Sequence, residues 1–174
     1  DYVRTLYEDK KGRFFIGSLN ALQIYDRATD SFTTIPMYLS SGDPIAPNIA
    51  TILERNNGEI LIGTSGHSMF ILETKGDSIN AKQISQFIPS NLIIYTYEDK
   101  KGNLWIATGD NGIFRFDKNN QSKHYTGDKD IAKNTVSSMC EDEQGNLYIS
   151  SLKRGLFIYN EKADTFTPLT YTPN

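Results

Sequence analysis

One motif recurs four times along the chain, and this recurrence limits the possible fold more than any other feature. Each copy has an acidic pair or its remnant, a tight turn that ends in glycine, and an apolar run. The turn glycines are 46, 44 and 43 residues apart and are Gly12, Gly58, Gly102 and Gly145. The apolar runs after them are RFFIGS, EILIGT, NLWIAT and NLYISS. A period in the low forties that contains several short apolar runs indicates a repeat array.

The local chemistry of each unit predicts strands rather than helices. The apolar runs are short and rich in Ile, Tyr, Phe and Thr, a composition typical of strands. No unit carries a long helical period. Each unit has one run before the acidic pair, two after it and a weaker closing run, and four antiparallel strands make one β-propeller blade. We therefore predict an all-β fold of four four-stranded antiparallel blades that form part of a larger propeller.

The repeat also predicts how the chain is divided. We expect residues 1–174 to form a single propeller segment, with approximate repeats at 1–48, 49–91, 92–134 and 135–174. The strand before each acidic pair is expected to be innermost and the variable closing strand outermost. Because the chain begins inside the pattern, at DYVRTLYED, we expect it to be a piece of a longer protein.

Three positions in the repeat have predicted structural roles. The Asp of the acidic pair can hydrogen-bond the turn backbone, and the turn glycine is expected to have a positive φ, so together they form a tight hairpin. This role is favoured over general acid–base catalysis by paired carboxylates. Bulky side chains in one column of the second strand should wedge between blades, and these are Phe15, Leu61, Trp105 and Tyr148.

Composition argues against several kinds of function. The formal charge of −3 and a pI near 5.4 do not suit a nucleic-acid surface. No apolar run approaches the roughly 18 residues of a membrane helix, so we expect no membrane contact by this segment. The two histidines, His67 and His124, lie at different blade positions, so no metal site or cofactor is expected. The single cysteine, Cys140, is expected to be buried by packing.

The sequence EDKKGNLWIATGDNGIFRFD, residues 98–117, resembles the two-component regulator propeller repeat. That pattern has an acidic pair, Gly-Asn-Leu-Trp-Ile, a small residue, Thr, a glycine-containing turn and an aromatic-ending strand. The fourth unit is also similar, with Tyr148 in place of Trp. The first two units are degenerate, because Phe15 and Leu61 replace Trp, and Ala21 and Ser68 replace the second turn glycine.

This resemblance implies a role in signalling. Such repeats form the periplasmic sensor region of hybrid two-component histidine kinases, inner-membrane proteins found chiefly in Bacteroides-like bacteria, where they typically respond to oligosaccharides. The segment itself would then not be an enzyme, although its parent protein would be a histidine kinase. Two alternatives are a non-catalytic protein-interaction scaffold and a propeller lyase. The lyase would need a His or acidic constellation at one channel mouth.

Ligand-binding residues are expected where the units differ most. The turn between the second and third strands and the connections between blades should share one face of a propeller, around the channel mouth. Their mixed polar side chains suit a sugar or a sulfated sugar. The candidates are Asn20, His67, Asp110, Asn111, Lys153 and Arg154 in the turns, and Tyr38, beside Asp43, in the connection MYLSSGDPIAPN.

The expected partners follow from the incomplete ring. Four complete blades in an open arc would leave the first and last blade with one uncovered apolar face each. Such faces normally find a partner. We expect them to contact the remaining blades of the parent sensor or to associate with another copy of the chain.

Overall fold

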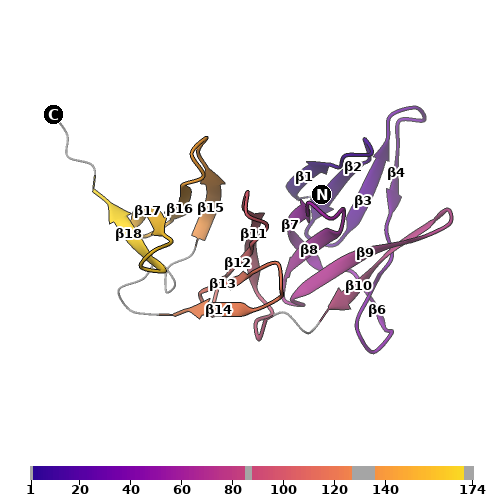
Figure 1. Ribbon diagram of the computed structural model, residues 1–174. Helices are drawn as coiled ribbons and strands as arrows, with labels where there is room; N and C mark the ends of the chain where they lie inside the picture. The colour runs from indigo at the N-terminus through magenta and orange to yellow at the C-terminus, as the bar shows by residue number, and fades with distance from the viewer. Residues whose placement is uncertain (1, 85–87, 127–135, 171–174) are drawn as a thin grey trace. The chain divides into compact units, whose positions relative to one another are not determined.

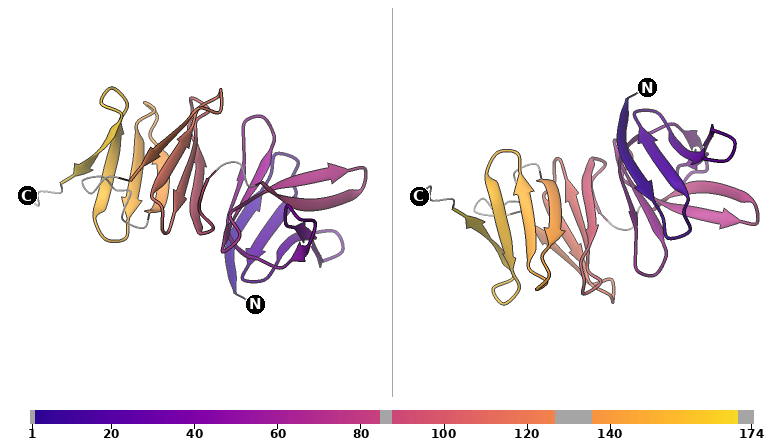
Figure 2. Two further views of the ribbon diagram at one scale, coloured as in Figure 1. Left: turned by 90° about the horizontal axis from the view of Figure 1, so that it is seen from below. Right: turned by 90° about the horizontal axis from the view of Figure 1, so that it is seen from above.

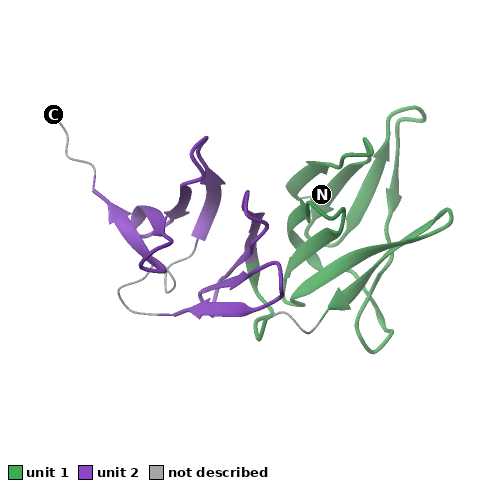
Figure 3. Cartoon of the chain, in the orientation of Figure 1, with its two compact units in different colours: residues 1–93 green, residues 94–174 purple. Residues whose placement is uncertain are grey.

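The structure is a computed structural model that describes residues 2–84, 88–126 and 136–170. All regular secondary structure in these residues is β, arranged as four small sheets, and none of it is helical (Figures 1 and 2). The chain divides into two compact units, residues 1–93 and 94–174 (Figure 3). Each sheet is a propeller blade, as the sequence predicts.

Blade 1 is a four-stranded antiparallel sheet whose strands pair in chain order. Its strands are β1 (Val3–Glu8), β2 (Phe14–Ser18), β3 (Leu22–Asp26) and β4 (Ser31–Thr34). Phe15 on β2 and Ile24 on β3 are direct cross-strand partners. Both side chains belong to the core of unit 1. The pairing therefore places one apolar column of the repeat on the face of the sheet that meets blade 2.

Blade 2 has the expected four strands and two more. The expected strands are β7 (Asn48–Glu54), β8 (Ile60–Ser65), β9 (Met69–Lys75) and β10 (Ser78–Ile84). The extra strands are β5 (Met37–Tyr38) and β6 (Pro44–Ile45), which extend the sheet beyond β10. Since β5 pairs with β10 in parallel, this sheet is neither four-stranded nor wholly antiparallel. The stretch connects blade 1 to blade 2, as the sequence predicts, but it also adds two short strands to the sheet of blade 2, which the sequence did not predict.

Blades 3 and 4 follow the predicted pattern. The strands of blade 3 are β11 (Ile93–Glu98), β12 (Leu104–Thr108), β13 (Ile113–Phe116) and β14 (Ser122–Tyr125). Those of blade 4 are β15 (Val136–Glu141), β16 (Leu147–Ser151), β17 (Gly155–Asn160) and β18 (Thr165–Leu169). In each sheet the strands lie in chain order.

The first hairpin of each blade is built from the acidic pair and the turn glycine. In blade 3 the Asp99 carboxylate accepts hydrogen bonds from the backbone N–H groups of Lys101 (3.0 Å) and Asn103 (2.8 Å). The N–H of Gly102 donates to the Asp99 carbonyl oxygen at 2.9 Å. All four turn glycines have φ between 76° and 85°, which confirms the predicted left-handed conformation. The acidic pair is thus part of the hairpin, as predicted.

A complementary pair of side chains closes each of these hairpins. The Asp9 carboxylate pairs with Arg13 at 2.6 Å in blade 1, and Asp99 accepts a 2.7 Å bond from the Asn103 side chain in blade 3. In blade 2 the charges are exchanged, because Arg55 stands at the Asp position and pairs with Glu59 at 3.2 Å. The degenerate second repeat therefore keeps the side-chain pair while reversing its polarity.

The Glu of the acidic pair joins its own blade to the preceding one. Glu54 of blade 2 accepts a 2.8 Å hydrogen bond from the backbone N–H of Lys10 in blade 1. Glu141 of blade 4 accepts the equivalent bond from Lys100 in blade 3, at 2.7 Å. Within each unit, a carboxylate from one blade thus fixes the hairpin of the blade before it.

The bulky column of the second strand is buried between blades where a following blade packs against it. Phe15 lies in the core of unit 1 with Ile49 of blade 2. Trp105 is fully buried, and its ring meets the ring of Tyr159 in blade 4 edge-on, with centroids 4.8 Å apart. These contacts confirm the wedge prediction for both residues, and Leu61 is buried as well. Tyr148 is only half-buried.

The prediction that Cys140 is buried is wrong, since its thiol side chain is exposed. Cys140 pairs across the strands with Tyr148. Directly opposed residues share a face of the sheet. Cys140 therefore lies on the open face of blade 4 rather than in the core of unit 2.

Candidate functional site

The predicted ligand residues of the turns occupy equivalent places in the four blades, between the second and third strands. Asn20, His67, Asp110, Lys153 and Arg154 are exposed, and Asn111 is half-buried. Each turn follows a strand whose last or next-to-last residue is Ser or Thr. The four positions present an amide, an imidazole, a carboxylate and two cationic groups to solvent.

A hydroxyl at the end of the second strand holds each turn. The Thr64 hydroxyl donates to the Ser68 carbonyl oxygen (2.8 Å) and accepts from the backbone N–H of His67 (3.2 Å). Thr108 does the same in blade 3, with Gly112 as acceptor (2.9 Å) and Asn111 as donor (2.9 Å). Ser and Thr commonly stabilise turns in this way. The exposed side chains are therefore displayed on a fixed backbone.

A residue of the fourth strand provides a second brace, which the sequence analysis missed. The Gln83 amide donates to the carbonyl oxygen of His67 at 2.8 Å. At the equivalent place in blade 3, His124 Nε2 lies 2.6 Å from the carbonyl oxygen of Asn111, and its ring stacks on Phe114 with centroids 3.9 Å apart. Both residues stand opposite a Phe of the third strand. The register of the fourth strand was the signal that could have identified them.

Tyr38 lies in the added strand β5 and not in a turn. It contributes to a shallow pocket of about 320 Å³ with Ser40, Glu73 and Lys82. The backbone N–H of Ser40 donates to the Gln83 amide oxygen at 3.2 Å, and the same amide group braces His67. Gln83 therefore connects the segment after Tyr38 to the His67 turn of the same blade.

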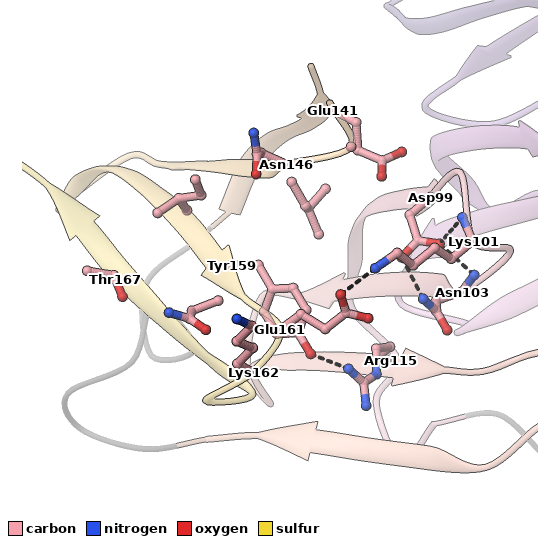
Figure 4. Close-up of a pocket in the computed structure, with 14 residues that line it drawn as sticks. Asp99, Lys101, Asn103, Arg115, Glu141, Asn146, Tyr159, Glu161, Lys162 and Thr167 are labelled. Carbon is pink, nitrogen blue, oxygen red and sulfur yellow. Dashed lines mark hydrogen bonds and ion pairs between the residues drawn. The ribbon is translucent and has the colours of Figure 1, made fainter. Parts of the chain in front are cut away.

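A larger pocket of about 480 Å³ lies in unit 2, between the first hairpins of blades 3 and 4 and the last hairpin of blade 4 (Figure 4). None of the predicted ligand residues lines it. Its polar groups are largely used within the protein. Lys101 pairs with Glu161, and Arg115 donates to the Tyr159 hydroxyl. These interactions explain why the walls of the pocket carry both signs of charge.

A cluster around Asp164 joins blades 3 and 4 beside this pocket. The Asp164 carboxylate accepts hydrogen bonds from the hydroxyls of Tyr125 and Tyr159, each at 2.6 Å, and pairs with Lys123. Arg115 approaches the same carboxylate at 3.2 Å. All four donors sit on β13, β14 or β17, so residues far apart in the sequence converge on one turn. The sequence analysis did not identify this cluster.

The cluster shifts the pKa of its members in opposite directions. Burial alone would raise the pKa of Asp164, but hydrogen bonds from Lys123, Tyr125 and Tyr159 lower it to about 2. Burial and then the hydrogen bond to Asp164 raise the pKa of Tyr159 to about 12. The same two causes raise the pKa of Tyr125. At neutral pH the carboxylate is therefore charged and both hydroxyls are protonated, a state suited to structural hydrogen bonding.

The described residues hold neither a metal site nor a candidate membrane helix. Within residues 2–84, 88–126 and 136–170, no three His, Cys, Asp or Glu side chains come together in a way that could hold a metal ion. In the same residues no helix is long and apolar enough to cross a membrane.

Comparison with known proteins identifies repeats in the second half of the chain. Residues 88–110 and 130–153 match the two component regulator propeller family. These stretches lie mostly in the third and fourth units, where the sequence resemblance was strongest. No curated protein sequence matches the chain.

Solved structures share the fold at low sequence identity. One is the extracellular domain of BT4673 from B. thetaiotaomicron, described as a putative one component or hybrid two component system; it is 19% identical, with a TM-score of 0.79 over 99% of this chain and 25% of its own. PorZ of Porphyromonas gingivalis, a surface component of the type-IX secretion system, is 16% identical, with a TM-score of 0.68 over 97% of this chain and 27% of its own.

Virginiamycin B lyase from Staphylococcus aureus is a third similar structure. It is 14% identical, with a TM-score of 0.67 over 99% of this chain and 57% of its own. At these identities the likeness establishes a propeller fold. The chain spans about a quarter of the length of BT4673 and PorZ.

The family match covers two stretches that together make up less than half of the chain. The fold of the chain resembles that of the extracellular domains of putative one or hybrid two component systems.

Proposed function

We propose that the chain is a ligand-sensing propeller segment from the sensor region of a two-component histidine kinase. The observation that carries this proposal is the family match over the third and fourth repeats. The parent protein would supply the kinase and response-regulator activities. The segment would lie in the periplasm as the extracytoplasmic part of an inner-membrane protein, and the similar fold of extracellular domains supports an extracytoplasmic location.

The proposed ligand is an oligosaccharide, recognised by the turns between the second and third strands. The exposed groups there include Asn20, His67 and Asp110, which can exchange hydrogen bonds with hydroxyls, and Lys153 and Arg154, which can bind a uronate or sulfate. The hydroxyl and fourth-strand braces support this assignment, because groups that are already fixed lose little conformational entropy on binding.

Calorimetric titration of the chain with neutral, uronic and sulfated oligosaccharides tests this proposal. One class should bind, and replacing both Lys153 and Arg154 with Ala should weaken binding by about tenfold or more, the scale of one charged hydrogen bond. Lys118→Ala is the matched control, since Lys118 is exposed in the turn between β13 and β14 and should leave affinity unchanged. If no oligosaccharide binds, the proposed sensing role of this chain is wrong. If the Lys118→Ala control loses as much affinity as the double variant, the proposal that the turns bind the ligand is wrong.

The principal alternative is a non-catalytic interaction scaffold. A scaffold would bind no oligosaccharide in the titration above.

A further inference from the structure

The two short strands that extend blade 2 form one wall of the smaller pocket, which lies in unit 1. This pocket of about 320 Å³ is lined by residues 38–42 of the added hairpin and by Glu73, Asn80 and Lys82 of β9 and β10. In the described residues, blades 1, 3 and 4 have four strands each and lack this extension. The pocket therefore arises where the second repeat departs from the common pattern.

The strand registers place four polar side chains on one face of the extended sheet. Tyr38 pairs with Lys82, and Asn80 pairs with Glu73. Paired residues share a face of a sheet, and so do residues two apart on one strand, such as Asn80 and Lys82. Met37, next to Tyr38, points the other way and is buried in the core of unit 1. A phenol ring, an ammonium group, an amide and a carboxylate therefore lie together at the pocket.

The hydrogen-bonding capacity of these four side chains is unused within the protein. Among the residues that the structure describes, none of the four makes a side-chain hydrogen bond or an ion pair. Glu73 and Lys82 carry opposite charges on the same face and still do not pair. The larger pocket of unit 2 differs, because there Lys101 is already paired with Glu161. The donors and acceptors of the smaller pocket are thus available to a ligand.

The wall that the added hairpin contributes is held in place by hydrogen bonds. The N–H of Leu39 donates to the Asp43 carbonyl oxygen, and the N–H of Gly42 donates to the Leu39 carbonyl oxygen, each at 2.9 Å. The N–H of Ser40 donates to the Gln83 amide oxygen at 3.2 Å, which ties the hairpin to β10. A wall that is already ordered loses little conformational entropy when a ligand binds.

The combination of side chains favours a neutral ring that carries several hydroxyl groups. A hydroxyl both donates and accepts, so neighbouring hydroxyls of a sugar can donate to the Glu73 carboxylate and accept from the Lys82 ammonium group. An anionic ligand would be repelled by Glu73, and a cationic ligand by Lys82. Tyr38 adds an apolar ring face with a polar tip. The volume is near the lower end of the roughly 300–1,000 Å³ of small-molecule pockets, which suits a short part of an oligosaccharide.

We propose that the pocket formed by Tyr38, Glu73, Asn80 and Lys82 binds a neutral sugar unit of an oligosaccharide. The sugar ring lies against the Tyr38 ring, and its hydroxyls bond to the three other side chains. The class of ligand rests on the proposed function. The site itself is additional, since none of its four residues belongs to the turns between the second and third strands.

Calorimetric titration of the chain with neutral tetrasaccharides of glucose, galactose, mannose or xylose tests the site. At least one should bind, and Glu73→Gln should weaken its binding by about tenfold, the scale of a hydrogen bond to a charged group. Tyr38→Ala should weaken binding at least as much, whereas Tyr38→Phe keeps the ring and should retain most of the affinity. Tyr2→Ala is the matched control, since Tyr2 is exposed in the same unit and does not line the pocket.

Replacing both Lys153 and Arg154 with Ala separates this site from the turns. Neutral binding that survives this double replacement and is weakened by Glu73→Gln supports the proposal. Neutral binding that neither Glu73→Gln nor Tyr38→Ala changes would overturn the site and leave the sensing role standing. Binding of sulfated or uronic oligosaccharides alone would do the same. If no oligosaccharide of any class binds, both the site and the sensing role are wrong.

Discussion

The contact between blades 1 and 2 and the contact between blades 3 and 4 share one hydrogen bond, here called the frame. They differ in the side chains that pack between the two blades, here called the filling. In unit 1 the filling is mainly aliphatic, with Ile49, Ile52 and Ile62 packed near Phe15. In unit 2 it is aromatic, with Trp105 among the rings of Tyr125, Tyr159 and Phe166. The frame is the carboxylate-to-hairpin hydrogen bond, which is 2.8 Å in unit 1 and 2.7 Å in unit 2.

The aromatic filling brings polar chemistry that the aliphatic filling lacks. Trp105 donates its indole N–H to the buried Asp99 carboxylate at 2.8 Å. Tyr125 and Tyr159 carry hydroxyls that must find an acceptor when buried, and Asp164 provides it. In unit 1 the residue at the Trp105 position is Phe15, whose side chain has no polar atom and needs no acceptor. The repeat therefore tolerates either filling as long as each polar atom that comes with it is satisfied.

The largest expected effect is the removal of the aromatic filling. Truncating a buried Trp to Ala typically costs about 3–5 kcal/mol, so Trp105→Ala should lower the free energy of unfolding by about that amount. Chemical denaturation followed by far-UV circular dichroism measures it. Tyr148→Ala removes the same column in blade 4, where the side chain is half-buried, and should cost much less. Equal losses of unfolding free energy in the two variants would mean that Trp105 does not stabilise the protein through its burial between blades.

The next effect tests the close packing in unit 1. A Cβ on Gly17 would lie 2.5 Å from Cγ2 of Ile49 in blade 2 and 2.6 Å from Cγ2 of Thr5. Overpacking of this kind typically costs about 1–3 kcal/mol, and Gly17→Ala should fall near the upper end. Thr5→Ser removes one of the two clashing methyl groups and should recover part of the loss in the double variant. Thermal melts of the three variants would decide this, and strictly additive losses would contradict the clash.

A smaller effect is expected from the charge of the Asp164 carboxylate, which joins blades 3 and 4 in unit 2. Asp164→Asn should cost about 2 kcal/mol at pH 7, because it weakens charge-assisted hydrogen bonds from Tyr125 and Tyr159. The folded-state pKa of Asp164 is lowered to about 2 from an ordinary value of 3.8. Its stabilisation is therefore present above pH 4 and is lost as the pH falls towards 2. Denaturation midpoints at several pH values should converge for wild type and variant in acid, and a constant difference down to pH 2 would argue against this role.

The smallest effect concerns the hairpin that both units share. Gly102 has a φ of 82°, and no neighbouring atom lies within 4 Å of a Cβ built there. Gly102→Val should cost about 1–2 kcal/mol because of backbone strain alone. Gly102→Asn should cost less, since Asn tolerates the left-handed region. Indistinguishable melting temperatures for the two variants would show that strain at this φ is not the cause.

The repeat pattern was sufficient to predict the strands, the first hairpins and the burial of Trp105, because these depend on local turn chemistry and on a column that recurs. The added strands β5 and β6 escaped prediction, since β5 pairs in parallel with a strand some forty residues away. The exposure of Cys140 was also missed. Its repeat position holds Tyr97 in blade 3, whose hydroxyl donates to Glu141 of blade 4 at 3.3 Å.

The candidate site was predictable only in part. The differences between repeats pointed to the turn residues, and the structure places them in equivalent exposed turns. Gln83 and His124, which brace two of those turns, lie in the least regular strand of the repeat, and only the strand register connects them to the turns. The Asp164 cluster needs side chains from two blades, so no single repeat reveals it.

Acid titration followed by tryptophan fluorescence tests the central comparison most directly. The chain has one tryptophan, Trp105, and it lies in the contact between blades 3 and 4, so its emission reports on that contact. As Asp164 gains a proton in a step centred near pH 2, the emission of the wild-type chain should shift to longer wavelength, and Asp164→Asn should lack this titration step. Superimposable titration curves for the two proteins would contradict the claim that the Asp164 charge closes the aromatic contact.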